Sequence, residues 1–149
     1  MTKPLELTSN TAAAVEEACL CLGAQRIARA VGRQYDAALR PVRLSNWQFT
    51  LLMMLVRDDP LTISALAHAL AMDRTTVTAN LKPLERRGLL MVEVDAEDRR
   101  VRRVVLTDAG RMLLTEALPL WQKAQAACTR TLGDTGRAAL RTAMAALST

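Results

Sequence analysis

The sequence predicts a mainly α-helical domain with one small β-hairpin, an α+β class, and three observations lead to this prediction. Half of the 149 residues are hydrophobic but only 3% are aromatic, so the core must use small aliphatic side chains, which favour helices. Apolar residues recur at helical spacing through most of the chain. One stretch, residues 89–107, instead has two short apolar runs around a polar loop. At this length we expect a single domain, residues 1–149.

Three helices are expected in the first half of the chain. The first covers residues 12–39, where apolar side chains form one stripe, and it ends before Pro41. The second begins with a capping box at residues 45–48 and stops at the Asp-Asp-Pro of residues 58–60. The third is short and covers residues 63–70.

A fourth helix is predicted over residues 73–87, and the sequence marks both of its ends. Asp73 can cap the first turn, and Gly88 can end the helix in a left-handed conformation. Pro83 removes a hydrogen bond inside the helix and is expected to kink it. The inward face of this helix consists of Val77, Leu81 and Leu84.

Residues 63–70 and 73–87 have the spacing of a helix-turn-helix, with the second helix as the recognition helix. Its first turns carry short polar side chains, which suit the major groove of double-stranded DNA. The residues expected to contact DNA there are Arg74, Thr75, Thr76, Thr78, Asn80 and Lys82. Arg74 can reach a guanine edge or a phosphate, whereas capping of the helix is the alternative role of Thr76.

Residues 89–94 and 102–107 are expected to pair as a hairpin, and a tiny strand near Leu61 would complete the order of elements. The hairpin carries four positive charges and one negative charge within six residues: Asp98, Arg99, Arg100, Arg102 and Arg103. A single arginine at such a tip can enter the minor groove, and we assign this role to Arg100, oriented by a bidentate pair with Asp98. A solvated charged loop is the alternative.

After the hairpin, Thr107 is the expected N-cap of a helix that runs to about Leu132, with one interruption at Pro119. A last helix is expected over residues 135–147. The first and last helices carry more apolar surface than the central module can cover. The side chains concerned in the C-terminal part are Leu113, Leu114, Leu118, Leu140, Met144 and Leu147. A second copy of the chain is the simplest cover, and packing back onto the module as a monomer is the alternative.

Composition excludes several classes of function. The net charge of +5 favours a polyanionic partner. The chain has no apolar run of about 18 residues and no signal pattern in residues 1–11, so we expect a cytoplasmic protein without a membrane partner. One histidine, no Gly-rich phosphate loop and no ligand-spaced cluster argue against an enzyme, a cofactor or a metal site. A winged helix that binds protein instead of DNA is the remaining competitor.

At these residues the chain resembles the MarR family of bacterial transcriptional regulators. The family's hallmark is Asp-x-Arg in the wing followed by Leu-Thr-x-x-Gly, and residues 98–100 and 106–110 match it fully. Residues 65–67, 73–78 and 84–89 match as well. The resemblance implies a homodimer, usually a repressor, that binds a pseudo-palindromic operator.

The resemblance also implies how the chain is organised. Residues 45–106 would form the winged helix-turn-helix lobe, and residues 12–40 and 108–147 would be the N- and C-terminal dimerisation helices. Effectors of the family bind between the dimer interface and the DNA-binding lobes. The sequence names no effector, and three candidates stay open.

The first candidate is an organic hydroperoxide. Cys21 and Tyr35 resemble the peroxide-sensing branch of the family, in which a tyrosine of the partner chain holds the oxidised cysteine. Fourteen helical residues span roughly 21 Å, so Tyr35 cannot reach Cys21 within one chain. Cys128 stands near the position of a resolving thiol. The chain departs from that branch at Gln25 and Asn46, where further tyrosines are usual.

The second candidate is a small aromatic or lipophilic acid in a cleft lined by Trp47, Phe49, Met53, Met54 and Arg26 or Arg29. Core packing is the alternative role of Trp47 and the methionines. The third candidate is a metal or metalloid at the thiols. Cys19 and Cys21 project about 200° apart on a helix, so they chelate one ion poorly unless the helix frays. In a reducing cytoplasm all three cysteines are expected to be in the thiol form at rest, and a buried structural role is open for each.

Overall fold

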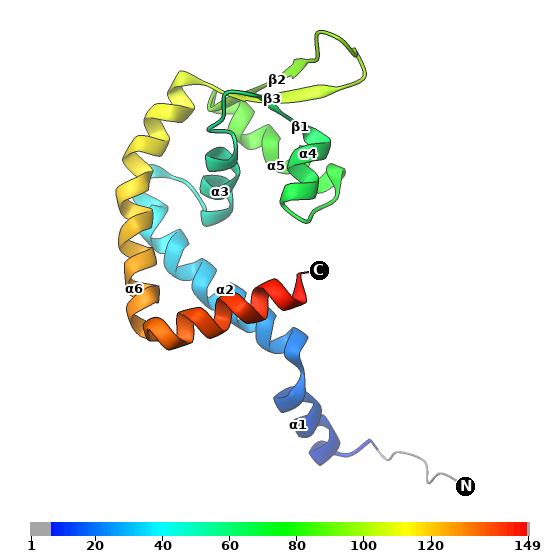
Figure 1. Ribbon diagram of the computed structural model, residues 1–149, viewed down its shortest axis with the longest axis vertical. Coiled ribbons are helices and arrows are strands. Elements are labelled where there is room, and N and C mark those ends of the chain that lie inside the picture. Colours follow the sequence, from blue (N-terminus) through cyan, green and yellow to red (C-terminus); the bar gives the residue numbers. More distant parts are fainter. Residues whose placement is uncertain (1–6, 149) are drawn as a thin grey trace, which may run out of the picture. The chain divides into compact units, whose positions relative to one another are not determined.

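The computed structural model describes residues 7–148, which belong to two compact units, Met1–Gln34 and Tyr35–Thr149. The first unit contains α1 (Ser9–Ala18) and most of α2 (Leu20–Leu39). No helix within the described residues is long and apolar enough to cross a membrane. The second unit holds the remaining elements, whose arrangement is drawn in Figure 1.

The elements of the second unit follow in the predicted order. They are η1 (Arg40–Val42), α3 (Asn46–Met54), β1 (Leu61–Thr62), α4 (Ile63–Ala69), α5 (Arg74–Arg86), β2 (Leu90–Val94), β3 (Arg102–Leu106) and α6 (Asp108–Leu147). The three strands form an antiparallel sheet in the order β1-β3-β2. Val104 of β3 pairs with Leu61 on one side and with Val92 on the other. The tiny strand and the hairpin are therefore confirmed.

The predicted starts of α3, α4 and α5 are confirmed, and each has a local cap. Ser45 and Gln48 form the reciprocal capping box of α3. Thr62 caps α4 and Asp73 caps α5 through their side-chain oxygens. The end of α3 was wrong: the helix stops at Met54, four residues before the expected Asp-Asp-Pro.

The expected single helix over residues 12–39 was also wrong, because the chain breaks between α1 and α2. Cys19 has an extended backbone, with ψ of 102°. Its N–H ends α1 by donating to the carbonyl of Val15, and its Sγ accepts the backbone N–H of Leu22. A cysteine thus caps the start of α2, a role for which serine or aspartate would be the ordinary signal.

The two internal prolines do not break their helices. α5 continues through Pro83 to Arg86, held by Leu81 and Leu84, which are both buried. The interruption expected at Pro119 is wrong, because α6 runs through this residue. The expected end of the helix near Leu132 is confirmed by a break at Gly133, with φ of 63° and ψ of 175°. A proline costs one hydrogen bond, whereas the positive φ of Gly133 takes the backbone out of the helical conformation and favours glycine.

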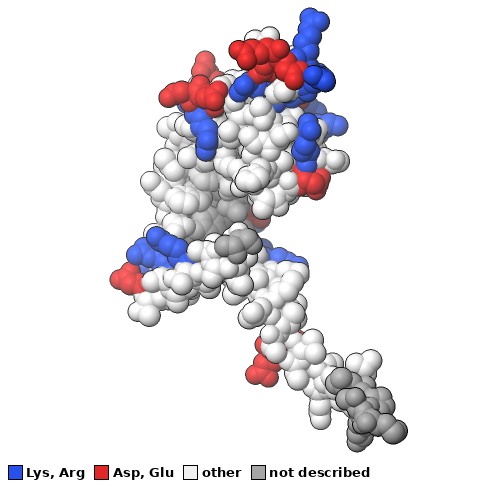
Figure 2. Space-filling model, turned by 45° about the vertical axis from the view of Figure 1, so that its right-hand side comes forward, with Lys and Arg blue, Asp and Glu red and all other residues white. Residues whose placement is uncertain are grey.

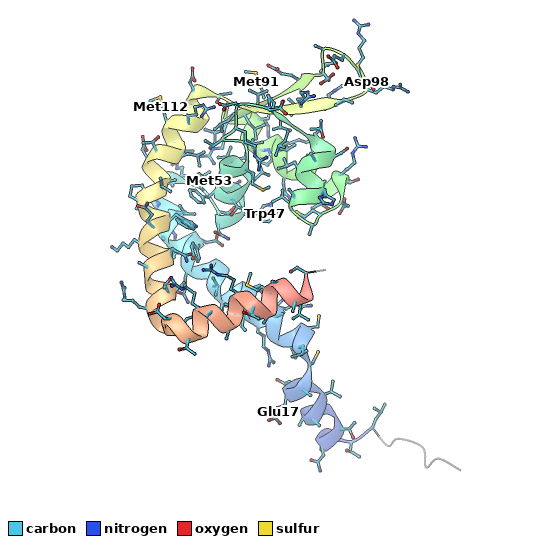
Figure 3. All side chains as sticks on the ribbon, viewed as in Figure 1. Glu17, Trp47, Met53, Met91, Asp98 and Met112 are labelled. Carbon is cyan, nitrogen blue, oxygen red and sulfur yellow. The ribbon has the colours of Figure 1, made fainter. Side chains whose placement is uncertain are left out.

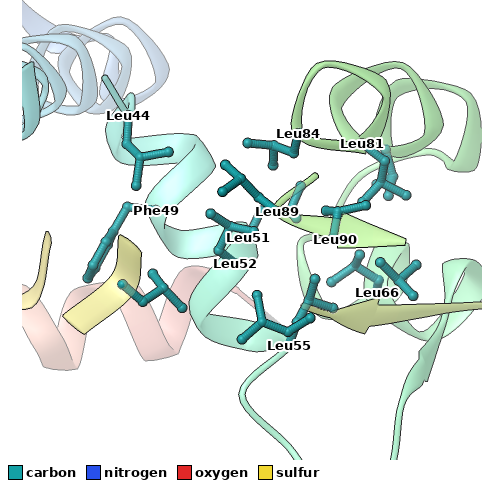
Figure 4. Close-up of a cluster of buried hydrophobic side chains, with 14 of the residues drawn as sticks. Leu44, Phe49, Leu51, Leu52, Leu55, Leu66, Leu81, Leu84, Leu89 and Leu90 are labelled. Carbon is teal, nitrogen blue, oxygen red and sulfur yellow. The ribbon is translucent and has the colours of Figure 1, made fainter. Parts of the chain in front are cut away.

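The core of the second unit is mainly aliphatic and includes side chains of α3, α4, α5 and the sheet (Figure 4). Among the described residues no charged side chain is buried. Leu114 lies in this core and Leu113 packs against it, so these two need no partner chain. The other apolar residues expected to need cover are exposed: Leu118, Leu140, Met144 and Leu147.

The start of α6 packs against the end of the recognition helix. Thr107 caps α6, since its Oγ1 accepts the N–H of Gly110 at 3.1 Å. The same hydroxyl donates to the carbonyl of Gly88 at 2.6 Å, and the N–H of Thr107 donates to that of Leu89. A Cβ on Gly110 would overlap the Leu89 carbonyl oxygen and lie 2.6 Å from Leu106 Cδ1. The Leu-Thr-x-x-Gly pattern is therefore a packing requirement.

We predict that Gly110→Ala lowers the free energy of unfolding by about 1–3 kcal/mol, because the methyl group has no space and backbone must shift. Urea unfolding with an unchanged m-value measures this. Gly136→Ala is the matched control on the same helix, because its Cβ would lie at ordinary contact, 3.6 Å from Leu132. It should be neutral or slightly stabilising. Equal effects of the two substitutions would contradict the close approach at Gly110.

Candidate nucleic-acid interface

The turn between α4 and α5 fixes how the recognition helix is presented. Ala71 adopts a left-handed φ of 50°, and Met72 donates its N–H to the carbonyl of Ala67 at 2.9 Å. The inward face of α5 is buried as predicted, at Val77, Leu81 and Leu84. The opposite face therefore points to solvent, and Arg74, Thr75, Thr78 and Lys82 are exposed on it, with Thr76 and Asn80 half-buried.

Two threonines of α5 use their hydroxyls within the helix. Thr76 donates to Asp73 Oδ2 at 2.6 Å and Thr78 donates to the carbonyl of Arg74 at 2.7 Å. The hydroxyl and then the N–H of Thr76 lower the pKa of Asp73, which keeps this cap ionised. Thr76 therefore has the capping role that was the alternative to DNA contact.

The tip of the hairpin is organised by Asp98, which Figure 3 shows at the end of the wing, defined here as residues 94–102. Asp98 Oδ1 accepts the backbone N–H of Arg100 at 2.9 Å and lies 3.4 Å from its Nε. One oxygen takes both contacts, so the expected bidentate pair is wrong. The Arg100 side chain is 92% exposed. Arg102 folds back, with Nη1 donating to the carbonyl of Arg99 at 2.7 Å.

Arg103 lies at the base of the wing, not at its tip. Its Nε donates to Asp95 Oδ2, and its Nη1 donates to the carbonyl of Pro60 at 2.8 Å. Asp59 is 3.5 Å away. Sequence reasoning counted Arg103 among the tip charges and missed Asp95 and Asp59. The available signal was the opposite charge of Asp95, at the start of the predicted hairpin loop, and Arg103, in the strand that follows the loop.

Positive side chains gather at the wing end of the lobe, next to an acidic group (Figure 2). A cluster of positive side chains of this kind suits a surface that steers a polyanion. The arrangement offers exposed guanidinium groups and a polar helix N-terminus.

The candidate effector residues lie in different places. Phe49 is in the core and stacks on Trp121, with ring centroids 5.9 Å apart. Trp47 has a buried Nε1 without a hydrogen-bond partner. Arg26 pairs with Glu16 within the first unit. A cavity of about 460 Å³ is lined by Phe49, Thr50, Met53, Met54, Val56, Arg57, Leu118 and Trp121. The structure thus gathers three of the predicted lining residues, and Trp47 is not among them.

The candidate thiols have distinct surroundings. Cys21 is exposed, and its Sγ accepts from Gln25 Nε2 at 3.4 Å. Tyr35 is buried and donates its hydroxyl to Gln125 Oε1. Burial and then the neighbouring Cys128 raise the pKa of Tyr35. The thiol beside Tyr35 in its own chain is therefore Cys128. Within residues 7–148 no three His, Cys, Asp or Glu side chains cluster so as to hold a metal ion.

Comparison with known proteins points to one family. The model of the MarR family matches residues 44–101. The organic hydroperoxide resistance transcriptional regulator of Bacillus subtilis is 28% identical over 101 residues, which are 68% of this chain and 69% of the relative. The match to the family model covers the helix-turn-helix and most of the wing.

Solved structures extend the similarity to nearly the whole chain. The M. tuberculosis regulator MosR, solved in complex with DNA, is 41% identical, covers 87% of this chain and 92% of its own, and has a TM-score of 0.78. The repressor CouR, solved on a DNA duplex, is 27% identical, covers 97% of this chain and 100% of its own, and has a TM-score of 0.81.

We predict that Arg100→Ala weakens binding to duplex DNA by about 1–3 kcal/mol and leaves the unfolding midpoint unchanged, because we expect the tip to contact DNA and it carries no core. Fluorescence anisotropy at fixed salt measures the affinity. Arg137→Ala, which removes one exposed arginine from α6, is the control for net charge. If both variants lose the same affinity, Arg100 has no specific place on the DNA.

Proposed function

The chain belongs to the MarR family, and from this premise we propose that it is a homodimeric repressor released from its operator by a small aromatic or lipophilic molecule. As a member of this family it is a DNA-binding transcriptional regulator and not an enzyme. Four points go beyond family membership and are proposed: the homodimer, repression as the direction of regulation, a pseudo-palindromic operator and the class of ligand.

One observation carries the DNA part of the proposal. Arg100 is almost fully exposed at a tip that Asp98 organises, on the same compact unit as the exposed first turn of α5. We assign Arg100 to the minor groove, where narrow A·T tracts concentrate negative potential. Arg74 is assigned to the major groove. Phosphate contacts are assigned to Thr75, Thr78, Asn80, Lys82, Arg99 and Arg102.

Unpaired apolar side chains support the dimer. Leu140, Met144 and Leu147 are exposed on the last turns of α6, and Leu20 and Ile27 are exposed on α2. An exposed apolar set of this kind marks an interaction surface, and a two-fold dimer is the commonest solution. Such a dimer would present two recognition helices about one DNA turn apart, which suits a palindromic operator.

The cavity beside α3 supports an aromatic effector. Its wall is formed by Phe49, Trp121 and two methionines, and Arg57 supplies a cation that can pair with a carboxylate. Its volume of about 460 Å³ is within the range of small-molecule sites. The similar repressor CouR has been solved with p-coumaroyl-CoA, an aromatic thioester. We therefore propose an aromatic acid or its thioester as the ligand class.

Oxidation of Cys21 is the second candidate, and the exposure of its thiol favours it. An organic hydroperoxide would oxidise the thiol to a sulfenic acid and leave as the alcohol. Condensation with a second thiol, Cys128, would then form a disulfide and release water. The Bacillus relative is named for organic hydroperoxide resistance. The bond from Tyr35 to Gln125 occupies the tyrosine that the peroxide-sensing arrangement would need.

An operator-release assay separates the two candidates. With the chain's own upstream DNA, we predict that hydroxycinnamate releases the wild type, and that Arg57→Ala needs about fivefold more acid because an exposed charge pair is lost. Arg111→Ala, an exposed arginine outside the cavity lining, should respond like the wild type. Anisotropy of the labelled duplex gives the midpoints.

The same assay with cumene hydroperoxide tests the thiol. On the ligand proposal, Cys21→Ser releases DNA in response to the acid as the wild type does. Release of the wild type by hydroperoxide, no release of Cys21→Ser, and no response to aromatic acids would instead establish the redox alternative.

A further inference from the structure

Asp95 and Arg103 form an ion pair that has no part in the DNA contacts or effector sites proposed above. Asp95 follows β2 and its side chain is only 11% exposed, whereas Arg103 lies in the central strand β3. The guanidinium joins two separate loops, since it donates to Asp95 in the wing and to the carbonyl of Pro60 before β1. Asp59 adds a second carboxylate at 3.5 Å.

The carboxylate of Asp95 divides its two oxygens between two tasks. Oδ2 accepts from Arg103, whereas Oδ1 accepts the backbone N–H groups of Glu97 at 2.9 Å and Asp98 at 3.0 Å. The N–H of Asp95 also donates to the carbonyl of Val101 at 3.1 Å, where the hairpin opens into its loop. The segment that leads into Asp98 and Arg100 is therefore tied through one side chain to the base of the sheet.

We propose that Asp95 and Arg103 are positioning residues that set the direction of the wing, so that Arg100 reaches the DNA while Arg103 does not touch it. The proposal rests on the role of Arg100 given above. Beyond the pair of Val94 and Arg102 the strand ladder ends, and the loop is held by backbone bonds of Val101 with Asp95 and Asp98. Within the loop these bonds do not reach the rest of the lobe, whereas the contact of Asp95 with Arg103 does.

The carboxylates around Arg103 and the pKa of Asp95 both indicate that this ion pair persists in the folded protein. Arg103 faces two carboxylates, so a DNA phosphate would have to displace Asp95 to take its place. Arg103, followed by the N–H groups of Asp98 and Glu97, lowers the pKa of Asp95 to about 2. The carboxylate of Asp95 therefore stays ionised in the folded protein near neutral pH.

Asp95→Asn gives the sharpest test, because electrostatics alone and the positioning role predict opposite changes in DNA affinity. Removal of a negative charge beside DNA should tighten binding by electrostatics alone. If Asp95 positions the wing, the substitution weakens binding about tenfold instead, although the amide oxygen can still accept the two N–H groups. Glu97→Gln is the matched control in the same loop, with the same change of charge, and should bind as tightly as the wild type or slightly tighter.

A double-mutant cycle with Arg100→Ala shows whether the pair acts through Arg100. The proposal predicts that Asp95→Asn has no further effect in the Arg100→Ala background, and that Arg103→Lys, which keeps the charge, shows the same coupling. Urea unfolding of each variant checks that the lobe stays folded. Binding by Asp95→Asn as tight as that of Glu97→Gln would overturn the proposal. So would a loss of equal size with and without Arg100.

Discussion

The contact between the start of α6 and the end of α5 is the constraint on which the rest of the structure depends. Thr107 bonds to the carbonyls of Gly88 and Leu89, and Gly110 leaves room for the Leu89 carbonyl. Gly88 reaches this point because its φ of 69° ends α5. The recognition helix, both hairpin strands and the long C-terminal helix thus meet within a few residues, so the direction of each is fixed by the others.

Two further sets of contacts hold the wing, one at its base and one where the strand ladder ends. At its base, β3 is the central strand and pairs with both β1 and β2. Where the ladder ends, Asp95 and Arg103 tie the loop to the carbonyl of Pro60. Arg100 then projects into solvent from a short turn fixed by Asp98. A flexible arginine on a fixed turn loses less entropy on binding DNA than one on a disordered loop.

Elements with a local signal could be predicted from the sequence, whereas features set by tertiary contacts could not. Caps at Ser45, Asp73 and Thr107 gave the helix starts, and the helix-turn-helix and the hairpin followed. The break at Cys19 could not be predicted, because a thiol is not an ordinary cap. The role of Arg103 needed the loop of Pro60, which lies 43 residues earlier in the chain.

We propose that this chain binds DNA through several phosphate contacts made by α5 and the wing. The dependence of affinity on salt tests it most directly, with the chain's own upstream DNA and anisotropy as the measurement. If six or more phosphates are contacted, the affinity falls by about a thousandfold or more between 50 and 200 mM salt, linearly in logarithms. An affinity that does not change over this range would contradict the account.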